Sequence, residues 1–155
     1  MEEKMVACSE CGALLSADES CAERFDRCLA KEFEDWTGYG AVHHLSVTCY
    51  WLQHPSRYSR QGWLEARGQL ADYLMAGKAP AKVRAQNRQR LDSGRRAWHV
   101  TRGERVVLPE GATWSRTVAD VRLESAAAYC ADVIAWARAV LSDTEPWGPL
   151  LGEPG

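Results

Sequence analysis

Apolar positions recur with the period of an α-helix over much of this chain. The first such run follows Ser20, and its apolar side chains are spaced four residues apart, so they share one helical face. These side chains are Phe25, Leu29 and Phe33. Glu23 stands three residues after Ser20, the spacing of a capping box at a helix N-terminus. We therefore predict a first helix over residues 20–34, with its aromatic stripe facing the core.

Four further segments carry helical patterns. A glycine-containing turn leads to a second helix over residues 41–53, which stops before Pro55 because the residue preceding a proline avoids helical geometry. A third helix follows Ser59 and has a clear apolar stripe: Trp63, Ala66, Leu70, Tyr73 and Leu74. A mostly polar helix over residues 80–91 and a long one over residues 125–141 complete the set. The face of the last helix carries Tyr129, Val133, Trp136 and Val140.

The segments between these helices lack their period. The first nineteen residues predict a knuckle or short ribbon, and loose alternation over residues 98–108 predicts a short β-hairpin. The predicted fold class is mainly α, a bundle of about five helices with a small N-terminal zinc knuckle. We expect one domain over residues 1–142, made of a knuckle over 8–21 and a helical body over 20–142. A proline- and glycine-containing tail, residues 143–155, is expected to be loose.

Composition agrees with a soluble globular protein. The 155 residues are 46% hydrophobic and 26% charged, which suits one domain with a substantial core. The acidic start after Met1 resembles no signal peptide, and no apolar run approaches the length of a membrane span. We therefore expect a cytoplasmic protein without membrane contact. Six cysteines in that compartment are more typical of thiols or metal ligands than of disulfides.

The most specific motif is a pair of cysteines, Cys8 and Cys11, followed by Gly12. Two thiolates at this spacing can bind one metal ion, and the glycine lets backbone amides turn towards the sulfur atoms. A redox pair is the alternative, but that function is typical of a strand-then-helix context that this segment lacks. The motif therefore favours a Zn²⁺ ion, which needs two more ligands.

The helical hairpin supplies candidates for those ligands. If the first two helices are antiparallel around a turn near residue 37, Cys21 at the start of one lies near His54 at the end of the other. The cysteine pair directly precedes the first helix and reaches the same end. We therefore predict a Cys₃His zinc site formed by Cys8, Cys11, Cys21 and His54.

The other histidines of the second helix belong to its opposite end. His43 and His54 are separated by about 16 Å along a helix, at 1.5 Å per residue, so they cannot bind the same ion. If the metal had only three protein ligands, His43 with Glu32 or Glu34 could serve as acid and base. His43 is thus kept as a candidate functional residue, although a hydrogen-bonded core histidine is the commoner role. His44 is a weaker candidate of the same kind.

Three cysteines lie outside the predicted site. Cys28 is two turns further along the first helix than Cys21. Cys49 and Cys130 lie in apolar helical stretches, where small buried side chains are the simplest interpretation.

Charge is distributed unevenly along the chain. Residues 78–105 carry nine cations and two acids, whereas residues 1–35 carry ten acids and four bases. Four arginines near Trp98 and His99 could contact phosphates while the aromatic ring stacks on bases. These candidate polyanion-binding residues are Arg84, Arg88, Arg95 and Arg96. The favoured alternative is a solvated helix that pairs with the acidic N-terminal third, and the pI of 6.1 agrees with it.

Several short motifs, in this order, resemble an uncharacterised bacterial family of small proteins that bears a domain-of-unknown-function label. The main segments are 8–13 (CSECGA), 20–25, 32–35 (EFED), 39–45 (YGAVHHL), 52–58 (LQHPSRY), 92–98 (DSGRRAW), 117–122 (TVADVR), 129–130 and 136–138. The resemblance implies one domain with a zinc-knuckle-like head and a mostly helical body, but no activity. Its Gln-His-Pro segment supports His54 as a ligand. Cys130, inside another segment, is the alternative fourth ligand to Cys21.

Three functions follow as hypotheses. The leading one is a zinc-stabilised helical module that binds another protein or a small ligand. The second is a zinc-dependent hydrolase or transferase with an open metal position near His54 and a pocket walled by Tyr50, Trp51 and Tyr58. The third is nucleic-acid binding through the arginine segment, residues 84–96.

Overall fold

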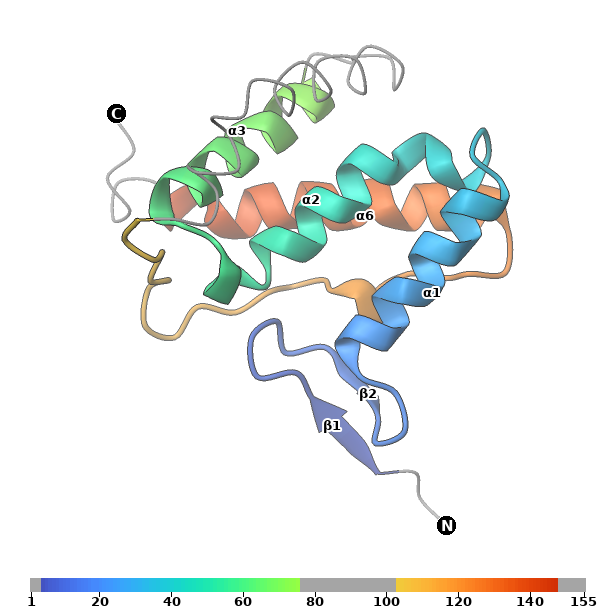
Figure 1. Ribbon diagram of the computed structural model, residues 1–155, viewed down its shortest axis with the longest axis horizontal. Coiled ribbons are helices and arrows are strands. Elements are labelled where there is room, and N and C mark those ends of the chain that lie inside the picture. Colours follow the sequence, from blue (N-terminus) through green and yellow to red (C-terminus); the bar gives the residue numbers. More distant parts are fainter. Residues whose placement is uncertain (1–3, 76–102, 148–155) are drawn as a thin grey trace.

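The computed structural model describes residues 4–75 and 103–147, and the predicted mainly helical fold is confirmed (Figure 1). Within these ranges there are four α-helices and one two-stranded sheet. The helix expected over residues 80–91 lies outside the described part of the chain. The core is formed where the helices meet, and the small sheet projects from the start of α1 (Figure 1).

The N-terminal ribbon is a β-hairpin built around the cysteine pair. Strands β1 (Met5–Ala7) and β2 (Leu14–Ser16) are antiparallel, with Val6 opposite Leu15. Between them, the Cys8 amide donates to the Ala13 carbonyl at 3.0 Å, and the Gly12 amide donates to the Cys8 carbonyl at 2.9 Å. Gly12 has a φ of 76°, which a residue with a side chain rarely adopts. The tight turn therefore places both thiols on the same side.

Helix α1 (Cys21–Glu34) begins as predicted. The Ser20 hydroxyl accepts from the Glu23 amide, and the Glu23 carboxylate accepts from the Ser20 amide, which completes the capping box. The predicted core stripe is wrong at Phe33, which is 66% exposed. The buried face of the helix is rotated by one position and carries Cys21, Phe25, Cys28 and Glu32.

Helix α2 (His43–Leu52) runs back along α1 after a 3₁₀ turn over Tyr39–Val42 (Figure 1). The turn approaches α1 closely at Gly40, where a Cβ would lie 2.8 Å from the Trp36 ring and 3.0 Å from the Glu32 carbonyl oxygen. A glycine at this position therefore lets the start of α2 lie against the end of α1.

Two long helices complete the bundle. Helix α3 (Arg60–Met75) buries four residues of the stripe predicted for it, Trp63, Ala66, Leu70 and Tyr73, whereas Leu74 is half-buried. Helix α6 (Ala126–Thr144) passes behind α2 in Figure 1 and buries its own predicted stripe, Tyr129, Val133, Trp136 and Val140. Indole N–H groups of both helices donate hydrogen bonds to the end of α2. Trp63 of α3 donates to the Leu52 carbonyl at 3.0 Å. Trp136 of α6 donates to the Gln53 side chain at 3.1 Å. The end of α2 is therefore fixed from two sides.

Residues 103–117, described ahead of the 3₁₀ turn that precedes α6, form a segment without helix. Its residues 103–108 include no partner strand of their own: Arg105 forms an isolated antiparallel bridge with Ser59. The first arm of the hairpin expected over residues 98–108 lies outside the described residues, so its pairing stays a prediction. A 3₁₀ turn, Val118–Asp120, then packs against α1. Beyond α6, Trp147 is buried and contacts the Trp114 ring edge-on, so the loose tail does not begin at residue 143.

Candidate metal centre

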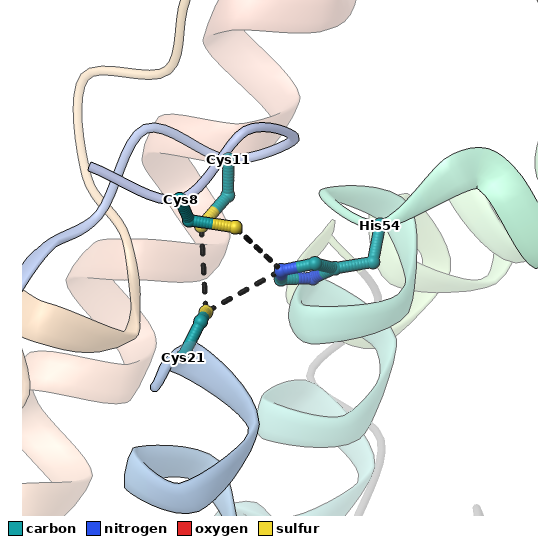
Figure 2. Close-up of side chains that lie close together, drawn as sticks. All are labelled: Cys8, Cys11, Cys21 and His54. Atoms are coloured by element: carbon teal, nitrogen blue, oxygen red, sulfur yellow. Dashed lines mark hydrogen bonds between the residues drawn. The ribbon is translucent and has the colours of Figure 1, made fainter. Parts of the chain in front are cut away.

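Four side chains from three parts of the chain converge at the base of the ribbon (Figure 2). Cys8 and Cys11 come from the turn between β1 and β2, Cys21 is the first residue of α1, and His54 lies two residues beyond the end of α2. Their donor atoms, three Sγ and one imidazole nitrogen, all lie within 4.8 Å of one another. The structure therefore brings together the four residues that the sequence predicts as ligands, and they could hold a metal ion.

The donor atoms are close but not covalently linked. His54 Nε2 lies 3.4 Å from Cys21 Sγ and 3.7 Å from Cys8 Sγ, and Cys11 Sγ lies 3.5 Å from Cys21 Sγ (Figure 2). A disulfide would need about 2.05 Å between sulfur atoms, so Cys11 and Cys21 are both free thiols. Cys11, Cys21 and His54 are buried, and Cys8 is half-buried.

His54 is held in one orientation by its neighbours. Its Nδ1 donates to the Tyr50 carbonyl at 2.6 Å, and its ring stacks on the Tyr50 ring with centroids 4.1 Å apart. Tyr50 in turn stacks on Phe25 of α1 at 4.0 Å. Because Nδ1 donates to the carbonyl, Nε2 is the nitrogen that faces the thiols, and it becomes a metal ligand when it loses its proton. A carbonyl partner on the second ring nitrogen is the usual support of a metal-binding histidine.

Gln53 fixes the position of His54 from inside the core. Its side chain is fully buried, accepts from the Trp136 indole and donates to the Arg116 carbonyl at 2.7 Å. The two residues therefore have separate roles. Gln53 binds the end of α2 to α6 through Trp136, and His54 contributes its imidazole to the cluster. The hydrogen bonds of Gln53 were not predicted from the sequence, although a polar residue at the end of an apolar helix was a signal for them.

Proximity strongly perturbs the protonation of the cluster. The hydrogen bond from Cys21 lowers the pKa of Cys11 to about 4, and the same interaction raises the pKa of Cys21 well above its ordinary value. Burial by itself would lower the pKa of His54, but hydrogen bonds with Cys11 and the Tyr50 carbonyl raise it to about 9. Without a cation, the site thus retains protons that a metal ion would displace.

Two contacts around the cluster support its shape. The Ala13 amide donates to Cys11 Sγ at 3.4 Å, a bond that favours the thiolate. The Glu10 carboxylate accepts from the Ser56 amide at 3.1 Å and so links the knuckle to the loop after His54. Sequence reasoning missed Glu10, which looks like an ordinary surface acid at the tip of a turn.

Two open hollows flank the cluster. The larger, about 530 Å³, lies between the ribbon and the start of α1, and the smaller, about 290 Å³, lies between α1 and the end of α2. Tyr50 and Trp51 line the smaller hollow as expected, together with Glu10 and Asp26, whereas Tyr58 does not line it. Among the described residues, no lysine or arginine lines either hollow.

The other candidates lie away from this centre. Cys130 donates to the Gly38 carbonyl at 3.4 Å, and His43 donates to Glu32 at 2.6 Å, both at the opposite end of α1. Cys130 therefore cannot replace Cys21 as a ligand in this arrangement. Cys28 and Cys49 are buried in the core, and burial raises both their pKa values, that of Cys28 to about 11. The arginines of residues 84–96 lie outside the described part of the chain.

Fold and site together define a small helical protein with an N-terminal Cys₃His knuckle. Residues 6–145 match the family of unknown function DUF5946, and the chain belongs to that family. Comparison with curated proteins and with solved structures gives no match. Among the described helices, none has the length and apolar character needed to cross a membrane.

Proposed function

We propose that Cys8, Cys11, Cys21 and His54 bind one Zn²⁺ ion. A tetrahedral zinc ion with bonds of about 2.3 Å to sulfur and about 2.0 Å to nitrogen needs sulfur–nitrogen separations of about 3.5 Å and sulfur–sulfur separations of about 3.8 Å. Three of the six donor separations, at 3.4–3.7 Å, are close to those of that tetrahedron, and all six are within 4.8 Å. Three thiols and one imidazole are also the donors that zinc favours, which makes this geometry the observation that carries the proposal.

The proposed ion has a structural role. Four protein donors fill a tetrahedron and leave no position for a reactive water, so the set supports a structural site over a hydrolase or transferase. The ligands come from the ribbon, α1 and the end of α2, and the ion would join these elements. We infer that zinc holds the ribbon on the helical body and that the protein acts as a binding module.

The hollows beside the centre are where we place the partner of this module. Their shape depends on the ribbon, which forms one wall of the larger hollow. Glu10 and Asp26 contribute negative charge to the smaller hollow, and Tyr50 and Trp51 contribute aromatic faces. These surfaces favour a protein segment or small ligand with a cationic group.

Metal analysis of the purified protein tests the zinc site. We expect close to one zinc ion per chain, and loss of it in Cys8→Ser and in His54→Ala. Cys130→Ser is the matched control, because this thiol lies outside the centre, and it should keep its zinc. Unchanged zinc content in Cys8→Ser would contradict the proposed ligand set.

Cobalt substitution separates a structural site from a catalytic one. A Co²⁺ ion in the same four-ligand site should give the intense visible absorption of tetrahedral thiolate coordination. Added azide should leave that spectrum unchanged, because no ligand position is open. A spectral shift with azide would instead support the hydrolase alternative.

A further inference from the structure

The four donors of the metal centre differ in how far solvent reaches them. Cys11 is buried and lines neither hollow. Cys21 and His54 border the larger hollow, but they are only 9% and 8% exposed. Cys8 borders the same hollow and is half-buried. A small reagent that enters from solvent therefore reaches the sulfur of Cys8 more readily than that of Cys11 or Cys21.

The wall of the larger hollow is acidic. Among the described residues it contains no lysine or arginine, but it contains several carboxylates. These belong to Glu10, Asp18, Glu19 and Glu23. Arg27, which does not line the hollow, forms an ion pair with Glu19 at 2.8 Å. The negative potential of this wall favours uncharged or cationic reagents over anions on the way to Cys8.

A second thiol lies beside Cys8 on the same loop. Cys8 and Cys11 come from one tight turn, whereas Cys21 is the first residue of α1 (Figure 2). The Gly12 amide donates to the Cys8 carbonyl at 2.9 Å and closes this turn. Residues three apart in such a turn have Cα atoms within about 7 Å, the separation that a disulfide needs. The two sulfur atoms, within 4.8 Å of each other, can thus join without displacing α1.

We propose that Cys8 is a modification site for a small uncharged oxidant of the hydroperoxide class, and that its oxidation to a disulfide with Cys11 releases the metal ion. This proposal rests on the zinc centre proposed above and concerns its regulation. The open hollow supplies access, the acidic wall disfavours anions, and the neighbouring thiol makes the product a disulfide. Because a disulfide can be reduced again, loss of the ion is reversible.

The reaction has two steps. The Cys8 thiolate attacks one oxygen of hydrogen peroxide, the O–O bond breaks, and the products are a sulfenic acid at Cys8 and a hydroxide. The Cys11 thiolate then attacks the Cys8 sulfur, the S–O bond breaks, and a second hydroxide leaves. The two thiolates lose two electrons together, and the peroxide gains both. The ion loses two of its four ligands and is held only by Cys21 and His54.

A shielded structural site would not react in this way. Such a site needs four protein ligands, and burial of all its sulfur atoms protects them from reagents. In this protein one of the three sulfur atoms borders an open hollow. A partner bound in the larger hollow would cover Cys8, so we expect partner binding to protect the centre from oxidation.

Hydrogen peroxide added to the zinc-loaded protein at neutral pH tests the proposal. A chromogenic chelator follows the released zinc, and peptide mass spectrometry, after the remaining thiols are blocked with N-ethylmaleimide, identifies the disulfide. We expect the Cys8–Cys11 disulfide to form first, with zinc released in equal amount. Cys130 is the internal control, since it is also half-buried but burial raises its pKa, and it should stay reduced. A first disulfide between Cys11 and Cys21 would overturn the proposal.

Zinc content, measured before the oxidant is added, separates two kinds of failure. A purified protein without zinc would contradict the metal centre, and this proposal with it. A zinc-loaded protein that keeps both its ion and the Cys8 thiol in peroxide would contradict the modification site alone. Dithiothreitol followed by zinc should restore the metal content of the oxidised protein, and a product that dithiothreitol does not reduce would contradict the disulfide.

A variant that narrows the hollow without removing a ligand tests the route of access. Ala22 is exposed near the start of α1 and lines the larger hollow, so Ala22→Phe should keep its zinc and slow peroxide-driven zinc release about threefold. Ala30→Phe is the matched control, because Ala30 is an exposed residue of the same helix that lines neither hollow. It should release zinc at the rate of the unmodified protein. Equal rates in all three proteins would contradict entry through the hollow.

Two alkylating reagents that differ in charge test the effect of the acidic wall. With rates expressed relative to free cysteine, uncharged iodoacetamide should modify Cys8 in the zinc-loaded protein about tenfold faster than anionic iodoacetate. Asp18→Asn removes one exposed carboxylate of the wall and should reduce this preference. Mass spectrometry of the peptide that contains Cys8 measures both rates. Equal relative rates for the two reagents would overturn the proposed preference for an uncharged oxidant.

Discussion

Helix α2 begins at one histidine, His43, and a second, His54, lies just beyond its end. Both imidazoles donate a hydrogen bond from Nδ1, but their surroundings differ. His54 donates from Nδ1 to a backbone carbonyl at 2.6 Å and directs Nε2 at three thiols. His43 donates from Nδ1 to a buried carboxylate, also at 2.6 Å, and has no described partner for Nε2. One histidine thus belongs to a shared cluster of donor atoms, and the other is bound to a single buried carboxylate.

The difference lies in what stabilises each end. The metal end gathers thiols and an imidazole that compete for protons, and we expect the proposed ion to stabilise it. The carboxylate end is satisfied by hydrogen bonds from three side chains of the chain itself. We therefore expect the two ends to respond separately to changes in metal, sequence and pH.

Removal of the metal should have the largest effect. Chelation of the proposed zinc should lower Tm by about 10 °C, because an ion bound only to the folded state stabilises it by several kcal/mol. Hydrogen exchange should show lost protection in β1, β2 and the first turn of α1, with protection retained around Glu32. Simultaneous loss of protection at both ends would show that they form a single cooperative unit.

Glu32→Ala should produce the next largest effect, at the opposite end. The substitution leaves His43, Ser46 and Tyr129 without their acceptor, and we expect a loss of about 3–5 kcal/mol in the free energy of unfolding. Urea denaturation measures it. Glu34→Ala is the control, since this exposed acid should change stability by no more than about 0.5 kcal/mol. Similar losses in both variants would mean that the buried network is not what stabilises this end.

The next prediction concerns the metal end alone, where the affinity for zinc should depend on pH. In the metal-free protein the pKa of Cys21 is raised and that of His54 is about 9, so both hold protons at pH 7. Zinc must displace at least these two protons, and its affinity should rise at least about 100-fold for each unit of increasing pH near neutrality. Competition with a chelator at pH 6 and pH 7.5 measures the slope. Equal affinities at both values would contradict the pKa shifts.

The sequence predicted the metal end well because its determinants are local. A capping box starts α1 at a defined residue, and the cysteine pair directly precedes that helix. In an antiparallel helical hairpin with a short turn, the residue that faces the start of α1 must come from the end of α2, which places His54 near Cys21. His54 could be selected because helix geometry excludes His43 from the same site.

The carboxylate end was only partly predictable. The sequence pairs His43 with Glu32 or Glu34 as a possible acid and base, and its apolar period places Phe33, and not Glu32, in the core. The structure reverses these two positions, since Glu32 is buried and Phe33 exposed. The reason is Tyr129, which reaches Glu32 from a helix 97 residues later. Periodicity within one helix cannot reveal a partner on so distant a segment.

Tyr129→Phe tests that long-range contact with the smallest expected effect. The substitution removes one hydroxyl from the fully buried Tyr129 and leaves Glu32 with two donors, so we expect a loss of about 2 kcal/mol in the free energy of unfolding. Tyr39→Phe is the matched control, because the Tyr39 hydroxyl donates to the neutral Leu123 carbonyl at 2.9 Å and should contribute about 1 kcal/mol. Zinc content should be unchanged in both variants. A loss of zinc in Tyr129→Phe would show that the two ends of α2 are coupled, and the separation drawn between them would fail.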